Sequence, residues 1–77
     1  MTLMDSHIKV GQTVEIQGFS GPELIRERLH EMGLRAGSKL FILGRAPFGG
    51  PLLVRFSHSF LALRSEEAQC ALVTVMP

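Results

Sequence analysis

The stretch SKLFILGRAPFGGPLLVRF, residues 38–56, carries two apolar runs around a glycine pair that is bracketed by prolines. The run from Ser38 to Gly44 predicts one strand, and the run from Leu52 to Phe56 predicts another. Ala46 to Pro51 predict the loop between them, in which glycine supplies the positive φ that other residues resist. The two prolines stiffen this loop and withhold two backbone donors. The stretch therefore predicts a β-hairpin with a stiff tip.

A glycine pair can also cradle a phosphate, which would make this loop a nucleotide site. Such a cradle leads from a strand into the N-terminus of a helix and often includes a lysine and a hydroxyl. Here Gly49 and Gly50 lead into Pro51 and a strand, with no GKS or GKT pattern. A nucleotide site is therefore disfavoured. Two roles stay open for Phe48, which is either tucked against the sheet or presented to a partner.

Further elements are expected on both sides of the hairpin. Apolar patterns predict strands at Thr13 to Phe19, Phe60 to Arg64 and Cys70 to Val75, and a short helical turn opened by its serine at Ser65 to Ala68. Residues 1–9 are expected to be a loose N-terminal lead-in. Five short strands with one helix between the first two are typical of a small SH3-like β-barrel. The sequence therefore predicts a mainly β fold with one short α-helix, in a single domain over residues 1–77.

The one longer helix is predicted from Gly21 to Met32. Ser20 is a suitable N-cap residue, and Glu23 three positions later completes a capping box. Gly33 supplies the left-handed position that ends the helix, and Leu34 can fold back as the apolar contact of a Schellman motif. The sequence therefore bounds this helix at both ends.

An apolar stripe on this helix is expected to face the core, and it contains Leu24, Ile25, Leu29 and Met32. Arg28 lies near the middle of the stripe. Its stem must pass the core, and its guanidinium must then reach backbone carbonyls, a carboxylate or a partner.

The polar face of the helix gathers Glu23, Glu27 and His30, and the last two have the i, i+3 spacing that can bring two side chains onto one cation. Such residues on an exposed face are more often solvated, and no CxxC or HxxxH pattern is present. Cys70 is expected to pack as a small hydrophobe. No Ser, His and Asp set has catalytic spacing. We therefore expect no metal site, no cofactor and no enzymatic activity.

Composition limits the remaining function classes. A chain of 77 residues that is 45% hydrophobic forms a small folded core but not a deep cleft. A net charge of +1 and five aromatic residues, all Phe, disfavour nucleic-acid binding. One cysteine excludes an intrachain disulfide and favours a reducing compartment. With no signal-peptide pattern and no membrane-spanning run, we expect a cytoplasmic protein without direct membrane insertion.

Two runs resemble the FeoA family, the small cytoplasmic proteins of bacterial ferrous-iron uptake: RERLHEMGLRAGSKLFILGRAPFGGPLLVRF and, after it, FLALRSEEAQCALV. The resemblance covers about Val10 to Val75, and its blocks are the helix ending MGLRAG, the segment APFGGPLLV and the segment LALRSEEA. The fold also resembles the C-terminal domain of iron-dependent DtxR-type repressors. This chain has no room for the DNA-binding and dimerisation parts of such a repressor, so the free-standing FeoA interpretation is preferred.

The resemblance implies an SH3-like barrel without enzymatic activity, whose partner is FeoB, a membrane ferrous-iron transporter with a cytoplasmic GTPase region. Three mechanisms stay open: modulation of nucleotide hydrolysis, assembly of the transporter, and direct delivery of iron. Assembly or regulation is favoured, because the Glu23, Glu27 and His30 cluster is a weak metal site. The helix ending and the hairpin tip are the hypothetical partner-binding residues: Leu34, Arg35, Arg45, Phe48, Gly49 and Gly50.

A competing class is a small nucleic-acid-binding or metal-repressor-type regulatory domain, since SH3-like barrels also occur on RNA. The near-neutral charge and the lack of Tyr and Trp count against this class. Two copies of the chain could also pair weakly through an exposed strand edge.

Overall fold

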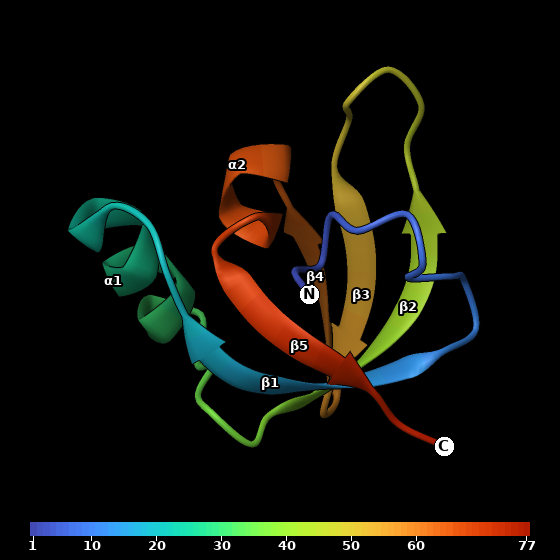
Figure 1. Cartoon of the computed structure of the whole chain (residues 1–77), viewed down its shortest axis with the longest axis horizontal. Helices are drawn as coiled ribbons and strands as arrows, with labels where there is room; N and C mark the ends of the chain where they lie inside the picture. Colours follow the sequence, from blue (N-terminus) through green and yellow to red (C-terminus); the bar gives the residue numbers. More distant parts are fainter.

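Five antiparallel strands form one curved sheet in the order β4-β3-β2-β1-β5 (Figure 1). The computed structural model describes all residues from Met1 to Pro77. Its elements are β1 (Thr13–Phe19), α1 (Glu23–Glu31), β2 (Lys39–Arg45), β3 (Leu52–Phe56), β4 (Ser59–Leu63), α2 (Ser65–Ala68) and β5 (Ala71–Val75). The mainly β fold with a helix between the first two strands is therefore confirmed, and each strand lies within one residue of its predicted position.

The core lies on the inner face of this sheet because apolar side chains alternate along the strands. In β3, Leu52 and Val54 are buried while Leu53 and Arg55 are exposed. Strand β1 pairs with both β2 and β5, so it is an interior strand next to the β5 edge, and β2 is the central strand. Register shifts in β1, between Ile16 and Gly18, and in β2 interrupt the ladders, and such bulges bend strands. The curvature lets one small sheet enclose its own core.

Helix α1 begins at Glu23, two residues later than predicted, and Pro22 holds the position before it without a side-chain cap. The predicted Ser20 capping box is therefore wrong. The backbone N–H of Ser20 donates to the Cys70 carbonyl at 2.9 Å, which ties Ser20 to the start of β5. Gly21, with φ of +86°, then turns the chain toward the helix. The tie to β5 keeps Ser20 away from the helix end.

The core-facing stripe of α1 is narrower than predicted. Leu29 is fully buried, and Ile25 and Met32 pack against the core from the same side. Leu24 is 63% exposed and Arg28 is also exposed, so neither belongs to the stripe. A short helix on a small sheet needs only residues at i, i+4 and i+7 for contact, and the neighbours of this line remain in solvent.

The C-terminal end of α1 has the predicted Schellman geometry. Gly33 has φ of +93°, and its N–H donates to the His30 carbonyl at 2.9 Å. The N–H of Leu34 donates to the Leu29 carbonyl at 3.1 Å, and the Leu34 side chain is completely buried. The motif therefore ends the helix and adds one more leucine to the core.

The N-terminal segment is packed against the sheet, which differs from the loose lead-in expected for residues 1–9. Leu3 and Ile8 are both in the core. The Leu3 N–H donates to the Ala71 carbonyl at 3.2 Å, and the Val73 N–H donates to the Met1 carbonyl at 2.8 Å. These bonds pair residues 1–3 with the outer edge of β5, and the N-terminus is marked just above β5 in Figure 1.

Candidate functional site: the β2–β3 hairpin

The tip of the β2–β3 hairpin presents Phe48 to solvent. The Phe48 side chain is fully exposed, and its backbone has φ of +59°, a conformation that non-glycine residues seldom adopt. The loop beneath it is closed by bonds from the Ala46 N–H to the Pro51 carbonyl at 3.0 Å and from the Gly50 N–H to the Pro47 carbonyl at 3.1 Å. The exposure of Phe48 contradicts packing against the sheet, and presentation to a partner stays a prediction.

The structure explains why both residues of the pair at the tip are glycines. Gly49 has φ of +73°. A Cβ added at Gly50 would lie 2.7 Å from the Cβ of Ala46, so a larger residue would force the two arms of the loop apart. The glycine pair therefore forms the turn on which Phe48 is raised.

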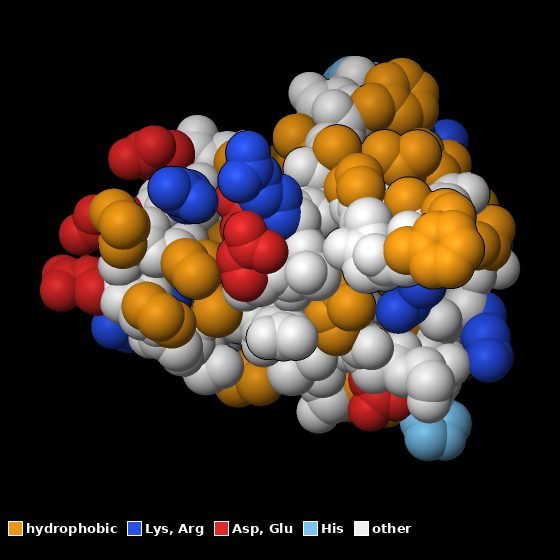
Figure 2. All heavy atoms as spheres, turned by 90° about the horizontal axis from the view of Figure 1, so that it is seen from above, with side chains coloured by type: hydrophobic (Ala, Val, Ile, Leu, Met, Phe, Trp, Pro, Cys, Tyr) orange, Lys and Arg blue, Asp and Glu red, His pale blue; other side chains and the backbone are white.

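The outer face of β2, β3 and β4 continues this apolar surface, and we call it the outer face of the meander. Leu43 is 37% exposed, Leu53 is 46% exposed and Phe60 is 74% exposed. The register places Leu53 opposite Ala62, and Phe60 opposite Arg55. The Arg55 guanidinium lies 5.0 Å from the centre of the Phe41 ring on the neighbouring strand. Figure 2 shows hydrophobic side chains gathered on the side of the molecule that carries the hairpin.

The helix ending does not contribute both of its proposed contact residues. Leu34 is completely buried, so the expectation that it projects toward a partner is wrong. Arg35 is exposed, and its Nη1 donates to the carbonyls of His30 and Leu34, each at 2.8 Å. The guanidinium therefore caps the C-terminal end of α1, where carbonyls lack helical partners and a cation is favoured.

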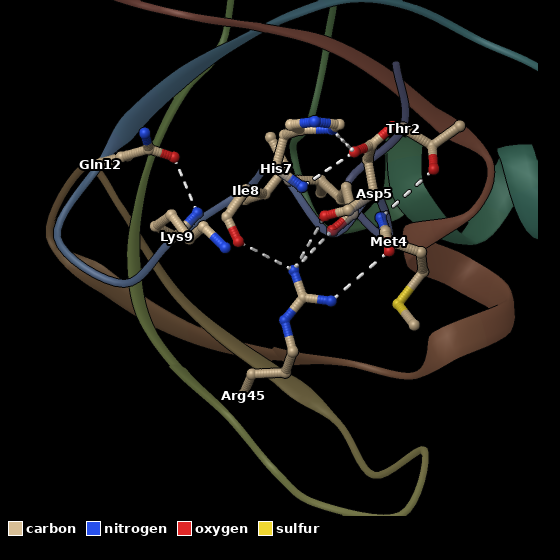
Figure 3. A network of polar contacts seen from close by, with 9 residues as sticks. Thr2, Met4, Asp5, His7, Ile8, Lys9, Gln12 and Arg45 are labelled. Atoms are coloured by element: carbon tan, nitrogen blue, oxygen red, sulfur yellow. Dashed lines mark hydrogen bonds and ion pairs between the residues drawn. The ribbon is translucent and has the colours of Figure 1, made fainter.

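Arg45, at the end of β2, is engaged with the N-terminal segment. Its guanidinium donates to the carbonyls of four residues at 3.3 to 3.5 Å, and these are Leu3, Met4, Asp5 and Ile8. Figure 3 shows the carbonyls turned toward the guanidinium from one side. The contact closes the segment over the barrel, and the sequence held no local signal for a bond between residues so far apart.

Replacing Arg45 by Met should release the N-terminal segment while the barrel stays folded. We expect amide exchange at Leu3 and Val73 to become at least tenfold faster, because the bonds of residues 1–3 to β5 lose their anchor. Hydrogen exchange followed by NMR measures this directly. Arg55→Met is the matched control, because Arg55 makes no contact with the segment. Unchanged protection of Leu3 in Arg45→Met would show that Leu3 and Ile8 hold the segment by burial alone.

The turn that follows in the same segment is organised by Asp5. Its Oδ1 accepts from the backbone N–H of His7 at 2.9 Å and lies 2.7 Å from the His7 Nδ1. The bond from the backbone of His7, followed by the side-chain bond, lowers the pKa of Asp5 below its usual 3.8. The pKa of Asp5 is lower in the folded protein than in the unfolded chain. The turn therefore stabilises the fold fully at a pH above the unfolded pKa, and this stabilisation is lost as the pH falls through the folded pKa.

The polar face of α1 does not gather a metal site. His30 lies edge-on to Phe19, with ring centres 4.9 Å apart and an interplanar angle of 80°. No group of three or more His, Cys, Asp or Glu side chains comes together in the structure. Cys70 is 5% exposed and belongs to the core, as predicted.

Sequence reasoning missed one buried carboxylate. Glu67, in α2, is 4% exposed, and its Oε1 accepts from the backbone N–H of Arg64 at 2.8 Å. The short helix is therefore stabilised by an acid that reaches back to Arg64, the N-cap residue, and Ser65 is the first residue of the helix and not its cap. A glutamate three residues after a helix start is the signal that could have identified this role.

Neither helix has the length and apolar character needed to cross a bilayer.

The five-stranded antiparallel fold with its raised hairpin defines a small SH3-like protein. A family model described as the FeoA domain matches residues 1–75, and the chain belongs to the FeoA family. Membership implies an accessory role in ferrous-iron transport.

Solved structures of similar proteins agree with this assignment. A FeoA protein from Chlorobium tepidum is 32% identical, with a TM-score of 0.84, and the match covers 100% of this chain and 71% of that one. FeoA from Stenotrophomonas maltophilia, an SH3 domain protein solved in complex with zinc, is 28% identical, with a TM-score of 0.77 over 96% of this chain and 89% of that one. A manganese-dependent transcriptional repressor shares the fold at 23% identity, with a TM-score of 0.88 over 99% of this chain and 36% of that one. No curated protein sequence matches the chain.

Proposed function

We propose that this FeoA protein is a non-enzymatic, cytoplasmic accessory protein that binds the cytoplasmic GTPase region of the FeoB transporter and assembles or regulates it. The observation that carries the proposal is Phe48, a fully exposed aromatic side chain at the apex of a stiff hairpin. Aromatic side chains held in this way are common anchors of protein interfaces. The contact residues are then Phe48 with Gly49 and Gly50 beneath it, and Arg35 beside the helix ending.

The backbone of the tip supports a contact role for Phe48. A non-glycine residue in the left-handed region costs roughly 1–2 kcal/mol, and here the cost exposes an apolar ring to water. Strained residues that also display a side chain are concentrated at binding sites. Leu43 and Leu53 extend the apolar surface at the base of the hairpin, which gives the anchor a surrounding area to exclude water.

Regulation or assembly of the transporter fits the site better than delivery of iron or direct completion of the GTPase site. Delivery of iron needs ligands that converge on a cation, and no such group is formed. Completion of a GTPase site by an arginine finger would need a free arginine on a mobile loop. Arg45 is the arginine nearest the tip in sequence, and its guanidinium is already bound to the N-terminal segment.

Phe48→Ala should weaken binding to the cytoplasmic region of the cognate FeoB at least tenfold without changing thermal stability. The lost ring removes an anchor, and its full exposure means that the folded state loses no packing. Amide NMR titration of labelled protein, with each nucleotide state of the GTPase region tested separately, measures binding and any dependence on nucleotide.

Leu24→Ala is the matched control, because Leu24 is 63% exposed on α1. Full affinity in Phe48→Ala would remove the tip from the interface. An equal loss in both variants would indicate non-specific apolar contact, and no binding of the wild-type protein in any nucleotide state would count against the proposed function itself.

A second candidate is a nucleic-acid-binding regulatory domain, and one observation favours it. Residues 32–65 contain five arginines and lysines and no acidic residue, although the chain as a whole is nearly neutral. Retention on heparin at about 150 mM salt would support this candidate, since phosphate binders retain affinity there. Elution below that salt concentration would exclude it.

A further inference from the structure

The two edges of the sheet differ in whether another segment of the chain pairs with them. The outer edge of β5 is covered by residues 1–3, through the Leu3–Ala71 and Val73–Met1 backbone bonds. The other edge is β4, which pairs with β3 on one side only. The sheet therefore has one protected edge and one open edge.

The hairpin between β3 and β4 determines which groups of β4 face outward. Ser57 and His58 form a two-residue turn, and Ser57 has φ of +57°. In such a hairpin the flanking residues, here Phe56 and Ser59, form a hydrogen-bonded pair, and bonded pairs then alternate along the ladder. By this alternation Phe60 and Ala62 turn their N–H and C=O groups away from β3. Both residues are exposed, and no turn, loop or cap hydrogen bond uses their backbone.

Strand β4 also lacks the features that usually protect an edge. Its sequence, SFLAL, contains no charge and no proline, and Phe60 is 74% exposed on the outer face of the meander. Natural sheets block open edges with charged residues, prolines, bulges or a covering segment, because a bare edge is a template for another strand. The bare edge at β4 is thus suited to receiving one.

Two arginines near β4, Arg55 and Arg64, indicate the charge of a strand that would pair with this edge. Between Glu31 and Glu66 the chain carries five cations and no acid, and these are Arg35, Lys39, Arg45, Arg55 and Arg64. None of the five lies within 4.0 Å of a carboxylate, since the one ion pair of the structure joins His7 and Asp5. Arg64 directly follows β4, and Arg55 is paired with Phe60 in the register. An acidic strand at this edge would bring counter-charges to Arg64 and Arg55.

We infer that β4 binds an extended, acidic segment of a partner protein as a sixth strand of the sheet. Backbone bonds to Phe60 and Ala62 would hold the segment, and its carboxylates would interact with Arg64, which follows β4, and with Arg55 on the neighbouring strand. A second copy of this chain is a poorer occupant, because its own β4 is uncharged and is flanked by the same cations. The inference goes beyond the proposed function, since it concerns the chemistry of the bound segment and needs no particular partner.

Two synthetic peptides test this inference without any knowledge of the natural partner. The probes are acetyl-EVEVEVE-amide and acetyl-KVKVKVK-amide, which have equal strand propensity and opposite charge. We expect the acidic peptide to shift the amides of Phe60 and Ala62 with a dissociation constant on the order of 1 mM, and the basic peptide to bind at least tenfold more weakly. Cross-strand contacts in NMR spectra would establish pairing with β4.

Variants separate backbone pairing from charge. Ala62→Pro removes one outward N–H and should abolish binding, and Phe60→Glu, which keeps the backbone intact, should weaken binding of the acidic peptide at the same edge. The double variant Arg55→Glu and Arg64→Glu should reverse the preference between the two peptides. The double variant Arg26→Glu and Arg28→Glu, which makes the same change in net charge at exposed positions of α1, is the matched control and should leave the order of preference unchanged.

Three results would overturn the inference: no amide shift at 5 mM acidic peptide, equal binding of both peptides, or shifts that lie away from β4. Sedimentation of the free protein gives a fourth test. Self-association that Ala62→Pro abolishes would assign the edge to a second copy and also overturn it.

Discussion

Leu34→Ala is expected to lower the free energy of unfolding by about 3 kcal/mol, which is the middle of the range for a buried leucine. The Leu34 side chain is completely buried behind the Schellman ending of α1, so the change leaves a cavity between the helix and the sheet. Urea denaturation of wild type and variant measures the difference. The same variant should keep full affinity for the FeoB cytoplasmic region under conditions where it is folded, because a buried side chain cannot touch a partner.

Leu24→Ala again provides the comparison for stability. Leu24 belongs to the same helix but is 63% exposed, and its truncation should change the free energy of unfolding by less than about 0.5 kcal/mol. A loss below about 1 kcal/mol in Leu34→Ala would contradict the packing described for the helix ending. Lost transporter binding by a folded Leu34→Ala protein would restore Leu34 to the interface.

Gly21→Ala is expected to be about as destabilising as Leu34→Ala, at about 3 kcal/mol, for two separate reasons. Gly21 has φ of +86°, where any other residue is strained, and its added Cβ would lie 2.6 Å from the Sγ of Cys70. Cys70 is 5% exposed in the core, so the sulfur has little room to move. Thermal and urea unfolding give the size of the effect.

A matched glycine separates the two causes. Gly11 has φ of +91°, and a Cβ there would meet nothing within 4 Å, so Gly11→Ala carries the backbone strain alone. The excess loss in Gly21→Ala is then the overlap with sulfur. Combining Gly21→Ala with Cys70→Ala should recover about 1 kcal/mol relative to the sum of the single changes. Equal losses at Gly11 and Gly21 would show that the core yields to the extra carbon.

The strands and the helix ending could be predicted because their signals are local. Apolar patterns identified strands β1 and β3, and Gly33 identified the Schellman motif. The same motif requires the residue after Gly33 to fold inward, so the sequence already held the reason why Leu34 is not a contact residue.

The features that sequence reasoning missed depend on contacts between distant residues. Leu3 and Ile8 are single apolar residues in a polar segment, and no periodic pattern reveals that they are in the core. The bonds from Arg45 to the carbonyls of that segment have no counterpart in local sequence. The exposure of Phe48 was undetermined for another reason: a turn rich in glycine and proline allows its apex side chain to fold either way, and only the backbone geometry decides.

The pairing of residues 1–3 with β5 has a consequence for folding during synthesis on the ribosome. Met1 and Leu3 are made early, yet their partners Ala71 and Val73 are made late, and β1 must also wait for β5. Strands β1 to β4 can pair with neighbours in sequence while translation proceeds, because β1 pairs with β2 and β2, β3 and β4 form the meander. The nascent chain therefore emerges with its first strand unpaired on one side, and the native sheet is completed only after β5 has left the exit tunnel.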